Sequence, residues 1–544
     1  MISTKYQRRT YIIFGLFCFL YAVIAANVYR LSIVQHDFYT NLGTQQYTLT
    51  VTQLPPRAHI VDRNNVPLAL NKEALSAFIM PHQLQQKEKL VPFLQKNFPE
   101  SYNRIQHKKD THFIYVGRRL TTQQQELLQP FKDIKCIQEQ SRYYPQSACS
   151  ILVGCTDIDN KGMCGIEYTY DKQLSGTPRT YELEKDARSG HFYFAKEEKS
   201  QGSQSEPIQL TIDSTLQFLA HEELAHTIKQ HQALEGGLII MNPKNGDILA
   251  MSCIPHFDPN DQAHLNIEHT KNCVISNTYE FGSINKVIVA MAALEEGLTT
   301  PEELIDCKNS KTTFLDGRKI NTWKEDGVIP FKQVIAASNN IGIALIAKRL
   351  QATLYEHYIR LGFGKKTGIT LPGEAKGFVN HPANWSKQSL ISLSYGYEVA
   401  STLLQEVSLF CLIAHQGHSV KPRILMAEPI SIGRKKYSDA TITAIQDILQ
   451  ETTLHGTAYR ANIKGYRVMS KTGSAHMLTN GQYDENKNIY SCIGIVEKGD
   501  YQRVIGVYLI KQGDKQKNVF ASNTAAPLLE HIAQRMLIHE KIIH

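Results

Sequence analysis

An uncharged run near the N-terminus constrains this chain more than any other feature of its sequence. Residues Tyr11–Tyr29 (YIIFGLFCFLYAVIAANVY) carry no formal charge, and the run approaches the ~20 apolar residues with which one helix crosses a bilayer. The basic residues Lys5, Arg8 and Arg9 precede it, whereas only Arg30 closely follows it. Because positive charge is retained on the cytoplasmic side, we predict a cytoplasmic stub at 1–10, a single-pass anchor at 11–29 and export of the remainder.

A cleavable signal peptide is the alternative interpretation of this run. Ala25 and Ala26 offer small side chains near a possible cleavage site. The length of the run favours an uncleaved anchor, and no second run of this quality occurs in the sequence.

The composition restricts the classes of protein to which this chain can belong. With 544 residues, 42% hydrophobic and 20% charged, the chain is long and apolar enough for two or three globular domains. The net charge of +8 is mild and no basic block occurs, so we expect no nucleic-acid partner. His221, His226 and His231 recur at intervals that spread them around a helix, and we expect no metal and no cofactor.

Ten cysteines in an exported chain permit disulfides without requiring them. Cys155 with Cys164, or Cys253 with Cys273, are close enough in sequence to pair. Spacing alone does not determine connectivity, and buried free thiols are an equal alternative.

The polar stretch Lys196–Ser205 separates two differently patterned halves and predicts a loop or linker. After it, Asp213 can cap a helix whose apolar positions follow the helical period. Asn245-Gly246 predicts a hairpin turn. The candidate strands are Gly237–Asn242, Asp247–Ser252, Tyr490–Val496 and Arg503–Ile510, and a last helix is expected from about Ala526 to Ile542. An antiparallel sheet with helices from both ends of its domain is therefore predicted, an α+β fold.

The strongest chemical signal is Ser283-Ile284-Asn285-Lys286. It opens an almost wholly apolar segment that ends near Gly297, which predicts a buried helix with Ser283 at its N-terminus. The i, i+3 spacing puts the hydroxyl and the amine on one face, where burial lowers the lysine pKa and lets the neutral amine activate the serine. A capping serine beside a snorkelling lysine is an equal alternative from this motif alone.

Two further triplets argue against that alternative. Ser338-Asn339-Asn340 begins another apolar helical stretch, and Lys471-Thr472-Gly473 follows later in the chain. Serine with its lysine, a second hydroxyl with a carboxamide, and another lysine on a strand form the penicillin-recognising motif set. Each triplet is common, but all three in this order and in suitable local structure are not.

A second K-T-G triplet, Lys366-Thr367-Gly368, has to be distinguished from the first. Its neighbours are turn-rich, whereas Lys471 follows Tyr466–Met469 and precedes the paired terminal strands. A substrate-binding strand needs an extended backbone that can hydrogen-bond a peptide. We therefore assign Lys471 to the site and Lys366 to a surface loop.

With these motifs, nearly the whole chain resembles a class B penicillin-binding protein. Other segments are similar to the family's pedestal motifs and to the entry of its transpeptidase domain. They are Arg57–Asn64, Arg142–Pro145, Gly165–Glu167, Leu174–Gly176, Leu210–Asp213, Asn242–Gly246 and Pro255–Asn260. Gly364–Glu374 also matches a family loop, which accounts for the second K-T-G. The spacing from Arg142 to Gly165–Glu167, with Asp186 and Gly190 beyond it, favours the division-specific septal branch over the elongation branch.

The sequence departs from the family pattern at several positions. Ala58 and Asn65 replace pedestal glycines, and Ser474 replaces the threonine usual after the K-T-G. Phe281 stands where proline is usual, and Asn285 where a large apolar residue is usual. No reacting group is lost, but Phe281 and Asn285 could reshape the cleft or alter antibiotic affinity.

The resemblance implies an α+β protein with an N-terminal transmembrane helix. An elongated mixed pedestal at 30–206 would precede a serine transpeptidase domain at 207–544, whose central antiparallel sheet is flanked by helices. The implied location is the inner (cytoplasmic) membrane, with the catalytic domain periplasmic. The implied partners are the membrane, peptidoglycan stem peptides, β-lactams, a membrane glycan polymerase and division-complex proteins.

Roles for individual residues follow from the same resemblance. Ser283, deprotonated by Lys286, would attack the D-Ala–D-Ala carbonyl of one stem peptide, and an amine of a second stem would take the acyl group. Ser338 would relay a proton. The backbone N–H groups of Ser283 and Ser474 would form the oxyanion hole. The implied substrate-binding set is Asn340, Lys471, Thr472, Gly473 and Ser474, and penicillin would mimic the dipeptide and trap Ser283.

Three alternatives share these motifs. A D,D-carboxypeptidase would give the acyl group to water, and a β-lactamase would need no large exported pedestal. An inactive scaffold or a β-lactam sensor would bind without turnover. A sensor of the usual kind would need several membrane spans and a cytoplasmic output domain, which this sequence lacks.

Overall fold

The computed structural model describes residues 4–53, 55–81, 84–107, 113–185, 192–479, 481–513 and 519–542. These form two compact units, one of Met1–Arg57 with Ser175–Ser205 and one of Ala58–Leu174 with Glu206–His544. The second unit holds both the predicted transpeptidase domain and most of the predicted pedestal. Asp186 and Gly190, which entered the branch assignment, lie outside the described residues.

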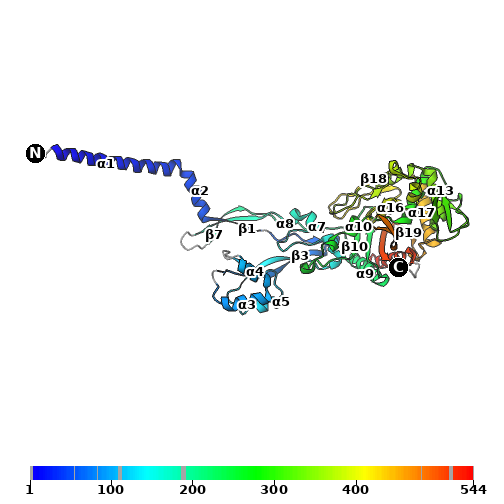
Figure 1. The fold of residues 1–544 in the computed structure, drawn as a ribbon, viewed down its shortest axis with the longest axis horizontal. Coiled ribbons are helices and arrows are strands. Elements are labelled where there is room, and N and C mark those ends of the chain that lie inside the picture. Colours follow the sequence, from blue (N-terminus) through cyan, green and yellow to red (C-terminus); the bar gives the residue numbers. More distant parts are fainter. Residues whose placement is uncertain are drawn as a thin grey trace. The chain divides into compact units, whose positions relative to one another are not determined.

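The first unit begins with the long helix α1 (Thr4–Tyr29), which continues as the π-helical turn η1 (Arg30–Val34) and is followed by α2 (His36–Tyr47) (Figure 1). The stretch Tyr6–Val34 is long and apolar enough to cross a membrane, and none of its most apolar window is buried by protein. This agrees with the predicted span at 11–29.

The rest of the first unit is a three-stranded antiparallel sheet in the order β1-β6-β7. Its strands are β1 (Thr48–Gln53), β6 (Arg179–Lys185) and β7 (Phe192–Ser200). The prediction of a loop over Lys196–Ser205 was therefore wrong for Lys196–Ser200, which belong to β7. Strand formation here depends on pairing with β6, and a polar composition does not reveal pairing with a distant partner.

A five-stranded antiparallel sheet in the order β10-β9-β21-β20-β19 organises the second unit (Figure 1). Its strands are β9 (Glu235–Met241), β10 (Ile248–Ile254), β19 (Arg467–Thr479), β20 (Gln482–Lys498) and β21 (Tyr501–Gln512). The Asn245-Gly246 hairpin is confirmed, and Gly246 has the positive φ of +80° that such a turn requires. The α+β prediction is confirmed with it.

Both faces of this sheet are covered by helices, which explains why β9 and β10 are almost wholly apolar and buried. On β9, Leu238 belongs to one core cluster and Ile239 to the other, because neighbouring side chains point to opposite faces. One face packs against α9 (Ser214–His231) and α18 (Ala525–His539). The other face packs against α16 (Leu403–Ala414).

Helix α9 begins where the sequence predicted. The side chain of Asp213 accepts a hydrogen bond of 2.9 Å from the Leu216 N–H and so caps the helix. On the other face, a side chain in place of Gly506 would lie 2.3 Å from a methyl group of Val407, so α16 sits directly on β21.

The pedestal part of the second unit is a second sheet, β4-β3-β2-β8, with an extra strand β5 paired to β3. These strands are β2 (Ile60–Val61), β3 (Pro67–Ile79), β4 (Ile114–Gly117), β5 (Lys135–Tyr143) and β8 (Ile208–Gln209). Helices α3 (Lys87–Asn97), α4 (Pro99–His107) and α5 (Thr122–Leu128) accompany it. Two family motifs meet here in a buried ion pair, because Arg142 Nε donates to Glu167 Oε1 at 2.6 Å.

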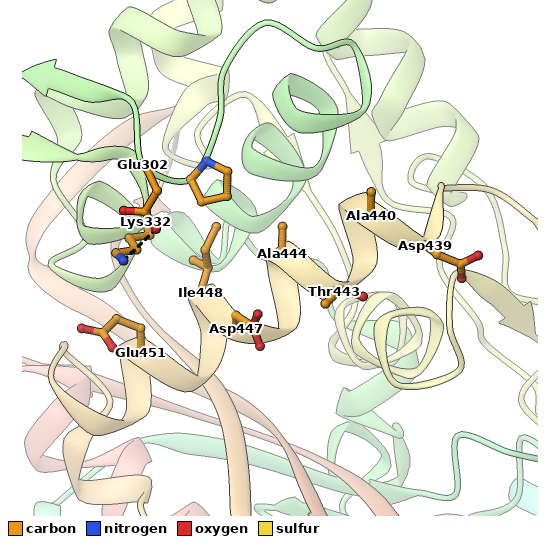
Figure 2. A pocket seen from close by; sticks show the side chains of 10 residues that line it. Glu302, Lys332, Asp439, Ala440, Thr443, Ala444, Asp447, Ile448 and Glu451 are labelled. Atoms are coloured by element: carbon orange, nitrogen blue, oxygen red, sulfur yellow. Dashed lines mark hydrogen bonds and ion pairs between the residues drawn. The ribbon is translucent and has the colours of Figure 1, made fainter.

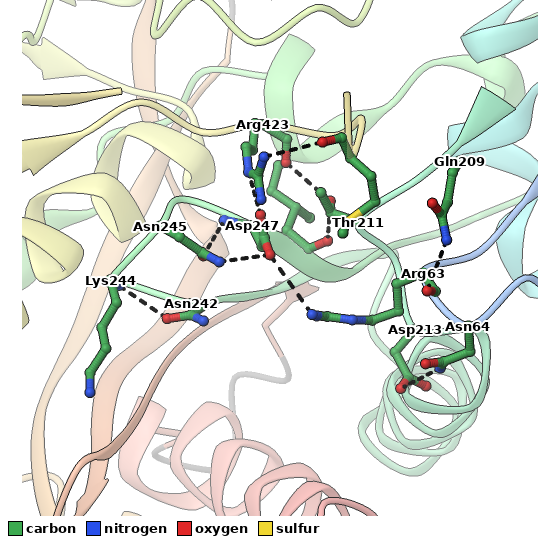
Figure 3. Close-up of polar contacts among 12 residues, drawn as sticks. Arg63, Asn64, Gln209, Thr211, Asp213, Asn242, Lys244, Asn245, Asp247 and Arg423 are labelled. Carbon is green, nitrogen blue, oxygen red and sulfur yellow. Dashed lines mark hydrogen bonds and ion pairs between the residues drawn. The ribbon is translucent and has the colours of Figure 1, made fainter. Parts of the chain in front are cut away.

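The segment Asp62–Asn64 joins the pedestal part to the start of α9 (Figure 3). The buried Asp62 accepts hydrogen bonds from the Asn64 N–H at 2.7 Å and the Ser214 hydroxyl at 2.8 Å. Arg63 lies 3.9 Å from the carboxylate of Asp247, which also binds Arg423. The charged groups of Asp62 and Arg63 are therefore used in contacts within the second unit, and these contacts fix the pedestal part against the start of α9 and the end of the β9–β10 turn.

The structure also separates the two cysteine pairs that spacing left open. Cys253 and Cys273 form a disulfide, whereas the sulfur atoms of Cys155 and Cys164 lie 3.7 Å apart without a bond.

Candidate active site

The nucleophile candidate Ser283 lies in a single 3₁₀ turn, η6 (Gly282–Asn285), that leads into α11 (Lys286–Glu295). Gly282 has a φ of +59°, and a Cβ there would lie 2.8 Å from the carbonyl oxygen of Ser474. The turn therefore needs glycine both for its backbone conformation and for the close approach of the neighbouring strand. Ser283 is half-buried and Lys286 is fully buried, so the predicted buried helix is confirmed.

The amine of Lys286 is held by the second motif. Its Nζ donates to the Ser338 carbonyl oxygen and to Asn340 Oδ1, each at 2.6 Å, and lies 3.1 Å from Ser338 Oγ. Burial lowers the pKa of Lys286 well below its usual value, and the nearby charge of Lys471 lowers it further. A lysine in this environment readily exists as the neutral amine that a general base requires.

In the second motif, the backbone of Ser338 has a left-handed conformation just before a helix begins. Ser338 has a φ of +56° and directly precedes Asn339, which caps α13 (Asn340–Leu350) by accepting from the N–H groups of Ile341 and Gly342 at 2.9 Å. Because Asn339 does the capping, the side chain of Asn340 is left to contact Lys286. The amide nitrogen of Asn340 donates to the Asn321 carbonyl at 2.7 Å.

The third motif lies on β19, as predicted. Lys471 is fully buried, and its Nζ lies 3.1 Å from Ser338 Oγ and 3.0 Å from the Thr472 carbonyl oxygen. Burial lowers the pKa of Lys471 to about 7. A Cβ on Gly473 would lie 2.3 Å from the Phe281 carbonyl oxygen, so only glycine lets β19 lie this close to the nucleophile turn. Ser474 is exposed beside it.

These contacts bring the three motifs together around one hydroxyl. Ser338 Oγ lies 3.1 Å from both buried amines, Lys286 Nζ and Lys471 Nζ. Among the hydrogen bonds of the described residues, none joins the Ser283 hydroxyl to Lys286. The second K-T-G lies elsewhere: Thr367 donates to Glu374 through its N–H at 2.6 Å and its hydroxyl at 2.5 Å, in a loop without regular secondary structure.

One residue beside the site, Thr457, was not predicted from the sequence. The hydroxyl of Thr457 lies 2.7 Å from that of Thr472 and fixes the side chain beside Lys471. Thr457 follows α17 (Asp439–Leu454) in a short irregular segment. A lone threonine after a helix is too common to be a signal, so only the tertiary contact identifies it.

A groove of about 630 Å³ beside α17 offers a different combination of polar groups (Figure 2). It is lined by Glu302, Lys332, Asp439, Thr443, Asp447 and Glu451 among others. Its lysine, Lys332, is ion-paired with Glu302 at 2.8 Å, and this hydrogen bond raises the pKa of Lys332. An amine kept protonated cannot act as a base, so this groove does not have the chemistry of the three-motif site.

The sequence matches two family profiles in tandem. The penicillin-binding protein dimerisation domain matches residues 52–210, and the penicillin-binding protein transpeptidase domain matches residues 236–534. Similar curated proteins include stage V sporulation protein D of Bacillus subtilis, which is 28% identical over 97% of this chain and 84% of its own length. Peptidoglycan D,D-transpeptidase FtsI of Buchnera aphidicola is 27% identical over 90% of this chain and 88% of its own length.

Solved structures share the fold. Penicillin-binding protein 3 of Mycobacterium tuberculosis, complexed with aztreonam, has a TM-score of 0.69 at 23% identity and covers 90% of this chain and 98% of its own. A peptidoglycan synthetase of Bifidobacterium adolescentis has a TM-score of 0.71 at 18% identity, over 91% of this chain and 97% of its own. With the transpeptidase profile matching more than half of its length and the three motifs assembled in one site, this chain belongs to the class B penicillin-binding proteins.

Proposed function

We propose that this chain is a serine D,D-transpeptidase that cross-links peptidoglycan stem peptides through an acyl-Ser283 intermediate and is covalently inhibited by β-lactams. The observation that carries this proposal is the position of the Ser338 hydroxyl, 3.1 Å from both buried lysine amines, one of which, Lys286, begins the helix that directly follows the Ser283 turn. Two buried lysines of lowered pKa linked by a hydroxyl can move a proton across the site.

In the first step, Ser283 Oγ bonds to the carbonyl carbon of the penultimate D-Ala, and the Ser283 proton passes to Lys286. The C–N bond to the terminal D-Ala then breaks, and the departing nitrogen takes a proton through Ser338. Backbone N–H groups of Ser283 and Ser474 stabilise the oxyanion. Asn340, held by Lys286, orients the substrate amide.

In the second step, an amine of a neighbouring stem attacks the ester carbonyl. The amine loses its proton to the Ser338–Lys286 relay, the new amide bond forms, and Ser283 recovers its hydroxyl. Lys471, Thr472, Gly473 and Ser474 act earlier: during the first step they hold the carboxylate of the terminal D-Ala until it leaves, a task that suits one positive charge flanked by hydroxyls.

Mass spectrometry of the detergent-solubilised full chain tests this function. A D-Ala–D-Ala-type thioester with an added D-amino acid should give an acyl-enzyme and then an amide product. Hydrolysis that ignores the added amine would identify a D,D-carboxypeptidase, and binding without any acyl-enzyme would identify a scaffold.

The lifetime of the penicillin adduct separates a transpeptidase from a β-lactamase. No glutamate between Ser338 and Lys471 has an asparagine four residues later, the pairing that commonly activates water in serine β-lactamases. Without such a base, attack of water on the ester lacks the ~10²- to 10⁴-fold contribution of general-base catalysis. We expect the penicilloyl-Ser283 mass to persist for many minutes. Clearance of excess penicillin by substoichiometric enzyme within minutes would contradict this.

We extend the proposal to a role in septal wall synthesis, with a membrane glycan polymerase and division-complex proteins as partners. Their support is the motif spacing and the name of the FtsI relative. We also propose the domain boundaries given above, with the pedestal at 30–206 and the catalytic domain at 207–544.

We further propose that the N-terminus is cytoplasmic and that the catalytic domain lies outside the cytoplasmic membrane. Protease added to intact spheroplasts should digest the chain beyond the anchor and spare a short N-terminal fragment, because basic residues at the start of α1 precede its uncharged run. A full chain that resists the protease until the membrane is lysed would reverse this topology. A soluble mature protein lacking residues 1–25 would instead favour a signal peptide.

A further inference from the structure

Two cysteines that the proposed reaction does not use meet where a short loop of the pedestal part closes on itself. Cys155 follows α6 (Ser150–Val153) and Gly154, and Cys164 directly precedes α7 (Gly165–Thr169). Their sulfur atoms lie 3.7 Å apart, in van der Waals contact, although the residues are nine positions apart in the chain. Cys155 is 1% exposed, whereas Cys164 is only partly buried.

The backbone of this loop holds the two cysteines side by side. The Met163 N–H donates to the Cys155 carbonyl oxygen at 2.8 Å. A Cβ on Gly154 would lie 1.9 Å from the Cys164 carbonyl oxygen, so only glycine lets the two backbone segments come this close. Rotation of the two side chains therefore has to close only the gap between 3.7 Å and the ~2 Å length of a disulfide bond.

Cys164 can be reached from outside, because it lines a pocket of about 230 Å³. Residues of α7 and of α10 (Cys273–Ser276) form the walls of this pocket together with Pro372. Its volume lies below the ~300–1,000 Å³ usual for drug-sized ligands, so it admits a small reagent or one end of a larger one. Since Cys155 is almost fully buried, such a reagent meets Cys164 first.

The two thiols also differ in acidity. The hydrogen bond from the Cys155 thiol lowers the pKa of Cys164, and the same bond together with burial raises the pKa of Cys155. The thiolate is the form that attacks a disulfide. Exposure and acidity therefore both make Cys164 the nucleophile and Cys155 the thiol that reacts second.

Metal binding is the other chemistry open to two thiolates. A structural zinc ion takes four ligands. In the described part of the chain, no group of three or more histidines, cysteines, aspartates or glutamates is placed to hold a metal ion. The carboxylate of Glu167, which follows in α7, already binds Arg142. Covalent pairing is therefore the reaction that this site supports.

We propose that Cys155 and Cys164 form a modifiable dithiol site, at which a small disulfide reagent oxidises the pair to a second disulfide bond of this protein. The Cys164 thiolate attacks one sulfur of the reagent, a mixed disulfide forms, and the other half of the reagent leaves as a thiolate. Cys155 gives its proton to that thiolate and attacks the Cys164 sulfur, and the second half leaves and takes a proton from solvent. In total, two protein thiols are oxidised and one reagent disulfide is reduced to two thiols.

The new bond would close the loop that leads into α7, the helix that carries Glu167. Glu167 forms the buried ion pair with Arg142 that joins two family motifs. Closing a loop removes conformational freedom from the unfolded chain, so the oxidised protein should be the more stable form. This inference goes beyond the proposed transpeptidase function and does not depend on acylation at Ser283.

Peptide mapping of the detergent-solubilised full chain tests the bond directly. The protein is incubated with oxidised glutathione and denatured, and its remaining thiols are blocked with N-ethylmaleimide. Trypsin then cuts after Lys161, between the two cysteines. Peptides 143–161 and 162–172 should appear as one linked mass that separates on reduction. Two unlinked, maleimide-labelled peptides would overturn the proposal.

Single variants test the order of the two steps. C155S keeps the nucleophile but lacks the second thiol, so it should retain one glutathionyl group on Cys164 and form no linked peptide. C164S should form no linked peptide and leave Cys155 unmodified. Because peptide 143–161 also contains Cys149, a link that persists in C155S would assign the bond to Cys149 and overturn the pairing. A glutathionyl group on Cys155 in C164S would overturn the assignment of the nucleophile.

Cys136 on β5 is the matched control for exposure, since it is an exposed free cysteine outside this loop. It should take up glutathione alike in the parent and in both variants, which shows that the reagent is active in every sample.

The melting temperature measures what the bond does. Oxidised glutathione leaves the Cys253–Cys273 disulfide in place, so the parent can be compared with itself before and after treatment. The Tm of the linked parent should rise by a few degrees, whereas C155S treated in the same way should show no rise. A linked parent whose Tm is unchanged or lower would overturn the stabilising role of the bond.

Discussion

Ser283→Ala is expected to abolish covalent labelling by a fluorescent penicillin, the largest effect anticipated for any single substitution in this chain. The acyl-enzyme requires an oxygen nucleophile at the start of α11, and Ser283 is the hydroxyl of the η6 turn. Removing one half-buried oxygen leaves the helix, both lysines and the surrounding core in place. Gel fluorescence and intact-mass spectrometry would measure the loss.

Two controls make this result specific. The melting temperature of Ser283→Ala should stay close to that of the parent, which excludes unfolding as the cause. Ser408→Ala, which removes a hydroxyl from α16, should label normally. Retained labelling of Ser283→Ala at another serine would refute the assignment of the nucleophile.

Lys471→Ala should slow acylation by penicillin by two orders of magnitude or more (about 10²-fold). The Lys471 amine is fully buried, touches Ser338 Oγ at 3.1 Å and is the proposed partner of the ligand carboxylate. Its loss removes a charge-assisted contact and one end of the Lys471–Ser338–Lys286 relay. Stopped-flow or competition kinetics with a reporter β-lactam would give the second-order acylation rate constant.

Lys366→Ala is the matched control, because it removes the lysine of an identical K-T-G triplet. Lys366 is exposed in a loop whose Thr367 is bound to Glu374, so we expect a rate constant within a few-fold of the parent. The opposite ranking of the two variants would mean that the wrong triplet has been placed in the active site.

Local sequence was sufficient for most of the architecture. The Asp213 cap, the Asn245-Gly246 hairpin and the apolar segment after Ser283 each depend on residues a few positions apart, and each has the predicted structure. The two K-T-G triplets were separable for the same reason, since strand and turn residues surround them differently. Where pairing with a distant partner mattered, local pattern failed: β7 continues to Ser200 through a polar stretch because β6 lies beside it.

The family could be predicted from the motifs, but not the contacts within the site. Spacing in the chain does not reveal that Ser338 Oγ lies 3.1 Å from two different lysines, or that Thr457 contacts Thr472. These distances depend on how α11, α13 and β19 pack around a shared core. That packing is set by the complementary fit of many side chains, each contributing little alone.

The sequence by itself determined the apolar first helix, the α+β class and the identity of the three motifs, because charge, period and turn chemistry are local properties. The tertiary structure alone decided that Cys253 pairs with Cys273, and that Asn340 faces Lys286 while Asn339 caps a helix. Each of these depends on residues far apart in the chain meeting in a dry interior, where an unpaired polar group is costly and a partner has to be found.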